Sequence, residues 1–222
     1  MPSLLQDAFF PLENYLAIKL AIRLARIQNT HFTNGSGTAQ PNGVITAATL
    51  GKTGLTGQTT TVIYDDLIDL IHSVDPAYRV GTPGVPRQLY VGNGVPTPNP
   101  VFMMHDSSLK VIRKLKDSQG HPLWAPPGMV YPGFSGQAPD TILGYPYVVN
   151  NDMPVMAANA KSILFGDFSN YFIRDALDVR LIRLDERYAD TLEVGFIAFM
   201  RSDGNLINAG TNPIKYYANS AT

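Results

Sequence analysis

A single long helical pattern near the N-terminus constrains the fold of this chain more than any other feature. The apolar positions that recur at helical spacing are Leu12, Leu16, Leu20, Leu24 and Ile27. Pro11 suits a first helical turn, because its fixed φ and missing N–H cost nothing there. Asn34-Gly35 is a typical C-terminal cap. A helix from Pro11 to about Phe32 spans about 30 Å, which is long enough to act as a strut.

Three basic residues, Lys19, Arg23 and Arg26, form a stripe on one face of this helix. Two interpretations stay open: a solvated face, or a surface that contacts acidic partners or nucleic acid. The whole chain carries 17 Lys and Arg against 18 Asp and Glu, a formal net charge of −1. No global excess of positive charge therefore indicates a nucleic-acid-binding protein.

The rest of the chain mixes short helices and strands without regular βαβ alternation, which indicates an α+β protein. The expected elements are helices at 64–73 and 108–117 and strands at 101–104, 143–150 and 163–165. Asp106 or Ser107 is the expected cap of the second helix, and Gly166-Asp167 is expected to close the last strand. Two Pro-rich segments, 81–100 and 125–139, are expected to be extended loops.

A densely charged antiparallel hairpin is expected near the C-terminus, with strands at 177–184 and 192–201. In its second strand Leu192, Val194, Phe196, Ala198 and Met200 alternate on one face. Ser202-Asp203-Gly204-Asn205 is a turn signal. The charged residues are Arg174, Asp178, Arg180, Arg183, Asp185, Glu186, Arg187 and Asp190. Exposed ion pairs contribute only about 0–1 kcal/mol, but charges across an interface fix register and exclude wrong partners. We predict a subunit interface here; an ordinary charged surface hairpin is the alternative.

No catalytic, cofactor-binding or metal-binding constellation emerges, so we expect a protein that is not an enzyme. Gly51-Lys52-Thr53 resembles the end of a phosphate-binding loop, but Thr46 stands where that loop needs glycine. The four histidines, His31, His72, His105 and His121, are too scattered for a zinc site and are expected to be surface or locally hydrogen-bonded residues. Cysteine is absent, which excludes disulfides and thiolate chemistry. No apolar run approaches the roughly 18 residues of a membrane span.

Six segments that together cover most of the chain carry a family resemblance. They are LLQDAFFPLENYLAIKLAIRLARIQNTHFTNGSGTAQPNGVIT (4–46), YDDLIDLIHSVDPAYR (64–79), MMHDSSLKVIRKLKDSQGHPLW (103–124), ILGYPYVVNNDMP (142–154), ILFGDFSNYFIRD (163–175) and RLDERYADTLEVGFIAFMRSDGNLIN (183–208). In this order the segments resemble the major capsid proteins of tailed phages, whose fold is named after phage Hong Kong ninety-seven.

The resemblance implies an α+β phage capsid fold in two domains. The long helix would be the spine helix of a peripheral domain (1–60), to which a hairpin (177–204) adds long strands. Residues 61–176 would form an axial domain with a mixed central sheet flanked by helices, and 205–222 a C-terminal segment. The chain starts almost directly at Leu4-Leu5-Gln6-Asp7. The family's N-terminal arm and extended loop are therefore expected to be missing.

The implied function is structural. Many copies would associate as pentamers and hexamers into an icosahedral shell, in the virion and in the host cytoplasm during assembly. The shell would enclose double-stranded DNA through weak nonspecific contacts, with Lys19, Arg23 and Arg26 as inner-face candidates. Scaffold, protease and portal proteins would be further partners, and no membrane is involved. Two alternatives stay open: an encapsulin-like compartment shell, and a small soluble enzyme with an unrecognised site.

Overall fold

The computed structural model describes residues 12–79, 99–117, 119–120, 123, 141–176, 180–184, 186–187, 189–191, 194–208 and 210–222. Several sequence predictions lie outside these ranges: Pro11, Asp178, Asp185, His121, Leu192 and most of both Pro-rich segments. The chain divides into two compact units. The first comprises Met1–Gly43 and Ile173–Asn205, and the second comprises Val44–Phe172 and Leu206–Thr222.

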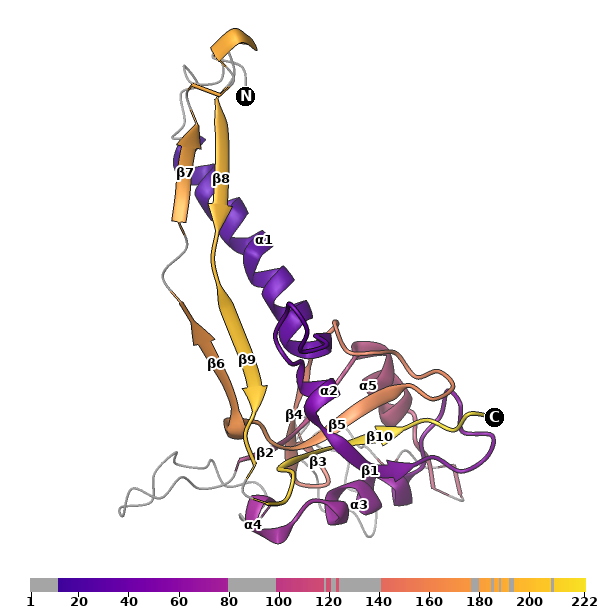
Figure 1. The fold of residues 1–222 in the computed structure, drawn as a ribbon. Helices are drawn as coiled ribbons and strands as arrows, with labels where there is room; N and C mark the ends of the chain where they lie inside the picture. Colours follow the sequence, from indigo (N-terminus) through magenta and orange to yellow (C-terminus); the bar gives the residue numbers. More distant parts are fainter. Residues whose placement is uncertain are drawn as a thin grey trace. The chain divides into compact units, whose positions relative to one another are not determined.

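A mixed six-stranded sheet organises the second unit (Figure 1). Its strand order is β1 (Thr49–Thr53), β10 (Ile214–Ala218), β5 (Lys161–Asp167), β2 (Pro100–Met104), β4 (Tyr145–Val149) and β3 (Thr141–Ile142). β1 pairs with β10 and β2 pairs with β4 in parallel, while the other neighbours are antiparallel. The sheet therefore combines segments from both parts of the second unit, and its second strand, β10, comes from the C-terminal part.

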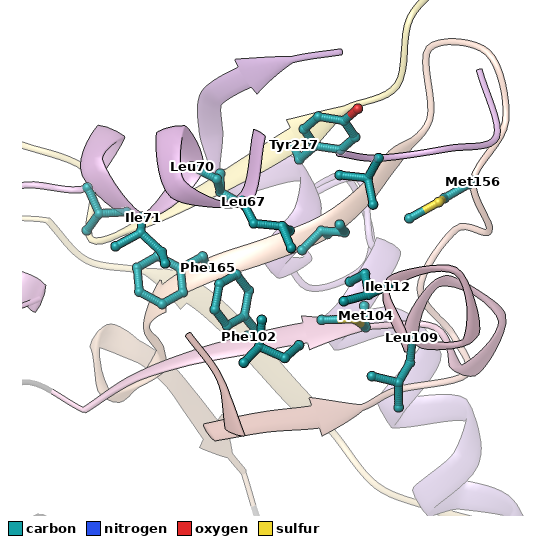
Figure 2. Close-up of a cluster of buried hydrophobic side chains, with 14 residues drawn as sticks. Leu67, Leu70, Ile71, Phe102, Met104, Leu109, Ile112, Met156, Phe165 and Tyr217 are labelled. Atoms are coloured by element: carbon teal, nitrogen blue, oxygen red, sulfur yellow. The ribbon is translucent and has the colours of Figure 1, made fainter. Parts of the chain in front are cut away.

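Both faces of this sheet are covered, because the side chains of β5 alternate between two apolar clusters. Ile163 and Phe165 belong to the larger cluster, with residues of α3 (Tyr64–Ser73) and α5 (Asp106–Arg113). Figure 2 shows Phe165 beside Phe102 in this cluster, with ring centroids 4.5 Å apart. Leu164 points into the smaller cluster, which includes residues of α2 (Val44–Ala47). A short helix, α4 (Pro76–Arg79), follows α3.

The first unit consists of one helix and a long two-stranded hairpin. The helix, α1, runs from Leu12 to Asn34 and ends where the Gly35 N–H donates to the His31 carbonyl. The hairpin contains two successive ribbons: β6 (Tyr171–Asp175) pairs with β9 (Ser202–Leu206), and β7 (Arg180–Leu184) pairs with β8 (Gly195–Phe199). A short 3₁₀ turn, η3 (Ala189–Thr191), lies in this unit, whereas another, η2 (Phe168–Asn170), belongs to the second unit. Gln28 of α1 donates a hydrogen bond to Ser202 of β9.

Residues 44–60, which we expected to belong with the long helix to a peripheral domain (1–60), lie in the second unit. The reason is packing: Val44, Ile45 and Ala48 are buried in its smaller cluster, and β1 extends its sheet. Whether the two units are the expected peripheral and axial domains stays a prediction.

Three local predictions are wrong, and one strand was not predicted. Ser202–Asn205 is not a turn but most of β9, because its backbone pairs with β6. Gly166-Asp167 does not close β5, which continues to Asp167 in register with β10 and β2. The helix α5 begins at Asp106 and ends at Arg113, and its cap is His105, whose ring accepts a hydrogen bond from the Ser107 N–H. We also did not expect β10, a strand with neighbours on both sides.

Candidate assembly surface

The helix α1 has apolar residues on two opposite faces. Leu16, Leu20 and Leu24, spaced by four residues, are half-buried. Tyr15, Ile18 and Ile22 lie on the other side of the helix and are 52%, 60% and 44% exposed. Their spacing of three and four residues aligns them along the axis, and Arg26 continues the same line one turn further. We call Tyr15, Ile18, Ile22 and Arg26 the helix stripe.

The two other predicted inner-face residues, Lys19 and Arg23, are exposed and lie four residues apart on the flank of the helix stripe. The ammonium of Lys19 lies 5.4 Å from the centroid of the Tyr15 ring, within the range of a cation–π contact. The described charged side chains of α1 are therefore all basic, and they border exposed apolar surface rather than a fully polar face.

The ribbon of β7 and β8 also has one bare apolar face. Arg180 pairs with Phe199, and Ile182 pairs with Ile197, so these four side chains share a face. Ile182, Ile197 and Phe199 are 44%, 45% and 43% exposed, and we call these three residues the ribbon stripe. Phe196 and Ala198 lie on the opposite face and are half-buried, which confirms the predicted alternation for the described part of this strand.

The structure separates the charges that the sequence grouped together. Arg180 and Arg183 differ by three positions in β7 and therefore lie on opposite faces of the ribbon. Arg174 is exposed on β6, and Asp190 is exposed in η3. Glu186 and Arg187 are exposed beyond the last ribbon pair, Leu184 and Gly195. The described charges thus surround the hairpin on several sides instead of forming one patch.

Apart from the ring of Pro41, the first unit has no buried apolar side chain among its described residues. Every buried aliphatic or aromatic side chain in the described structure, proline aside, lies within Val44–Phe172 or Leu206–Thr222. Among the residues of the first unit that the structure describes, the buried positions are Thr33, Gly35, Pro41, Gly43 and Gly204. A large exposed apolar area on a soluble protein typically marks an interaction site. The sequence already contained one signal for this area, the spacing of Tyr15, Ile18 and Ile22, which our sequence analysis missed.

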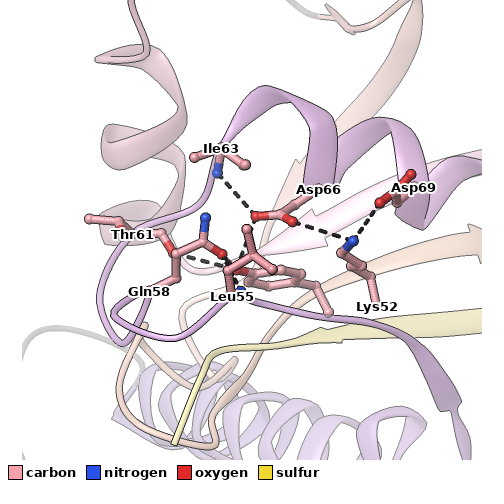
Figure 3. Close-up of polar contacts among 8 residues, drawn as sticks. Lys52, Leu55, Gln58, Thr61, Ile63, Asp66 and Asp69 are labelled. Atoms are coloured by element: carbon pink, nitrogen blue, oxygen red, sulfur yellow. Dashed lines mark hydrogen bonds and ion pairs between the residues drawn. The ribbon is translucent and has the colours of Figure 1, made fainter. Parts of the chain in front are cut away.

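Lys52, from the rejected phosphate-loop motif, belongs to a polar network in the second unit (Figure 3). Its ammonium lies 2.5 Å from a carboxylate oxygen of Asp69 and 3.9 Å from one of Asp66. Asp66 is buried and accepts hydrogen bonds from the Ile63 N–H and the Tyr217 hydroxyl. The hydrogen bond with Asp69 raises the pKa of Lys52, and burial together with Asp66 raises the pKa of Tyr217. This network joins β1, α3 and β10, and its contacts are structural.

Three of the four histidines are locally hydrogen-bonded, as predicted. His31 contacts Gln40, His72 contacts Arg79, and His105 caps α5. Within the described ranges, no three His, Asp or Glu side chains come close enough to hold a metal ion. No described helix is both long and apolar enough to cross a membrane.

Comparisons with known proteins agree with one another. Residues 2–218 match the model of a family described as the phage capsid family. The chain is similar to the capsid of an empty GTA particle computed with C5 symmetry, at 27% identity and a TM-score of 0.75, over 98% of this chain and 69% of that chain. For the capsid of the native GTA particle, also computed with C5 symmetry, the identity is 28% and the TM-score is 0.75, over 98% of this chain and 69% of that chain. A structure from Mycobacterium phage Bobi shares the fold at 17% identity and a TM-score of 0.60, over 99% of this chain and 68% of that chain. No curated protein matches the sequence significantly.

Proposed function

Because the chain belongs to the phage capsid family and is a structural subunit of a capsid, we propose that many copies associate through the first unit into a closed icosahedral shell that encloses double-stranded DNA. One observation carries this proposal: the described first unit exposes apolar and charged side chains but buries no apolar side chain other than Pro41. Burial of such surface against neighbouring copies would be favourable by about 25 cal/mol per Å² of apolar area.

The two units would have different tasks in this shell. The second unit has a sheet with both faces covered and would be the axial domain, which meets its copies around five-fold and six-fold axes. The first unit would be the peripheral domain, with α1 as its spine helix. The interface candidates are Arg174, Asp178, Arg180, Arg183, Asp185, Glu186, Arg187 and Asp190. Those that the structure describes are exposed, as an interface between copies requires.

Contact with DNA would be weak and nonspecific. Lys19, Arg23 and Arg26 are the candidates for the inner face, and a formal net charge of −1 does not favour tight binding to the cargo. Scaffold, protease and portal proteins would be further partners during assembly in the host cytoplasm, and the assembled subunit would reside in the virion capsid.

Light scattering and negative-stain microscopy of the purified chain test the shell. We expect particles far larger than the 24.2 kDa monomer. The double variant Arg183→Glu/Arg187→Glu is expected to retain the circular dichroism of the native chain but to form fewer particles, because both side chains are exposed on the hairpin. Normal particles from this variant would exclude these charges from the interface. A strictly monomeric native chain at high concentration would contradict assembly by the chain alone.

The cargo needs a separate experiment. Particles isolated from the organism that carries the gene can be treated with nuclease and then opened. Protected double-stranded DNA would support the phage-type shell, whereas enclosed protein without DNA would support an encapsulin-like compartment.

A further inference from the structure

The helix stripe and the ribbon stripe need a partner that covers apolar surface. DNA would neutralise Lys19, Arg23 and Arg26 but would leave Tyr15, Ile18 and Ile22 uncovered, since phosphate contacts bury little apolar side-chain area. The three residues lie opposite the half-buried leucine face of α1, so folding of the subunit leaves them exposed. A protein surface with an apolar centre and an acidic end fits the helix stripe better.

The chain itself contains such a surface. The ribbon stripe of Ile182, Ile197 and Phe199 is apolar. Beyond its end, the tip of the hairpin exposes two carboxylates, Glu186 and Asp190, with the exposed Arg187 between them in sequence. The helix stripe has the same order, with three apolar residues followed by Arg26. We propose that the helix stripe of one copy packs on the ribbon stripe of the next copy, with Arg26 at the neighbour's Glu186 and Asp190.

The lengths of the two surfaces agree. Tyr15 and Arg26 are eleven residues apart, which at about 1.5 Å per residue is about 16 Å along the helix. Arg180, which pairs with Phe199, and Glu186 are six residues apart, which at about 3.3 Å per residue is at most about 20 Å along the strand. Apolar residues can therefore meet apolar residues while Arg26 reaches the acidic tip.

This contact joins two different surfaces, so each copy can bind one neighbour through α1 and another through its ribbon. Contacts of this kind close into rings or continue as chains, which suits the shell on which this inference rests. The proposed contact also gives the basic residues of α1 different roles. Arg26 belongs to the contact between copies, Lys19 lies seven residues before it and borders the same face, and Arg23 on the flank stays available for the inner face.

Cysteine cross-linking tests the contact directly, because the chain has no native cysteine. We expect the double variant Ile18→Cys/Ile182→Cys, treated with a short bis-maleimide, to give a ladder of trimers and larger species. Each single variant can give dimers at most. The matched control is Ile18→Cys/Leu181→Cys: Leu181 is similarly exposed, at 41%, but lies on the opposite face of β7. Equal ladders from both double variants, or no ladder from either, would overturn the proposed contact.

Charge reversal tests the acidic end within the same assay. Arg26→Glu is expected to lower the ladder yield about tenfold, because like charges across an interface are strongly unfavourable. Glu186→Lys/Asp190→Lys in the same chain should restore the yield. Arg23→Glu, three residues away on the flank, should leave the yield unchanged. An equal loss from Arg23→Glu would instead indicate a nonspecific effect of charge and would contradict the assignment of Arg26.

The outcomes separate this inference from the proposed function. Particles that form without the Ile18–Ile182 ladder would leave the shell function intact and remove the pairing of the two stripes. A ladder without closed particles would support the pairing and contradict unaided shell closure. If anionic lipid vesicles bind α1 and protect Ile18→Cys from the maleimide while the ladder is absent, a membrane is the occupant and the proposal is wrong.

Discussion

Gly166 is the penultimate residue of β5, where the backbone of Pro213 approaches it closely. Its φ is +150°, and a Cβ at this position would lie 2.7 Å from the Ile214 Cα and closer still to the Pro213 carbonyl oxygen. Backbone atoms in a central sheet cannot move away cheaply. We expect Gly166→Ala to destabilise the protein by more than about 3 kcal/mol.

The measurement for Gly166→Ala is urea denaturation followed by circular dichroism. Gly57→Ala is the matched control, because Gly57 also has a positive φ but a Cβ there would meet nothing within 4 Å. The control should cost only about 1 kcal/mol. An equal loss of unfolding free energy from both variants would show that the positive φ, and not the approach of Pro213, is the reason why position 166 requires glycine.

Asp66 and Asp69 both face Lys52 but differ in burial. The side chain of Asp66 is 2% exposed, and that of Asp69 is 54% exposed. Asp66 accepts two hydrogen bonds on Oδ2 and faces Lys52 with Oδ1, so an asparagine whose amide oxygen keeps both hydrogen bonds would turn its NH2 group toward the Lys52 ammonium. We expect Asp66→Asn to lower the free energy of unfolding by about 2 kcal/mol and Asp69→Asn by less than about 1 kcal/mol. If urea denaturation showed that Asp69→Asn lowers the free energy of unfolding more than Asp66→Asn does, this prediction would be contradicted.

The raised pKa values of Tyr217 and Lys52 predict a loss of stability in alkali. Burial first, and then the charge of Asp66, keep the Tyr217 hydroxyl protonated in the folded chain, whereas the unfolded chain releases this proton near pH 10. The hydrogen bond with Asp69 acts in the same direction on Lys52. The folded state thus binds more protons above about pH 10, so stability falls as pH rises. Urea midpoints at about pH 8 and about pH 11 should differ less in Tyr217→Phe than in the native chain.

At the scale of helices and strands, local patterns predicted the elements that have a helical period or a short apolar run, including β2 and β5, although these two strands pair from distant parts of the sequence. The helix at Tyr64–Ser73 has the predicted bounds, and α1 reaches Asn34 instead of Phe32. The strand β9 was missed because its residues carry weak strand signals, whereas β10 was missed although Ile214, Tyr216 and Tyr217 favour strands. β9 contains Ser, Asp, Gly and Asn, which favour turns, and only its pairing with β6 makes it a strand.

The candidate surface was only partly predictable for a related reason. Exposed charges on the hairpin follow from composition, but the face of each charge depends on the register of β7 and β8. On α1 the leucine series indicated one apolar face, and Ile18 and Ile22 fell between its members. A helix with apolar residues on opposite faces gives no clear amphipathic pattern, so a stripe that a folded subunit leaves bare is easily missed.

At the scale of the whole molecule, the two units differ in where their stability comes from. The second unit has two apolar clusters, one on each face of its sheet. The described first unit relies on half-buried side chains and hydrogen bonds, such as those from the Asn42 N–H to the Gly204 carbonyl and from Gln28 to Ser202. Few buried apolar contacts imply a low free energy of local opening, so neighbours in an assembly would contribute much of the order of the first unit.

Hydrogen exchange with mass spectrometry can measure this difference. In the unassembled subunit we expect amides of α1 and of β7 and β8 to exchange at least about tenfold faster than those of β5 and β10, which lie inside the sheet. In assembled particles the first unit should become protected, while β5 and β10 should change little. The amides of α1 near Tyr15 to Ile22 are the most informative, because a neighbour on the helix stripe stabilises that helix directly. Slow exchange of α1 before assembly would mean that the half-buried leucine face alone holds this helix, and that neighbouring copies dock on an already stable strut.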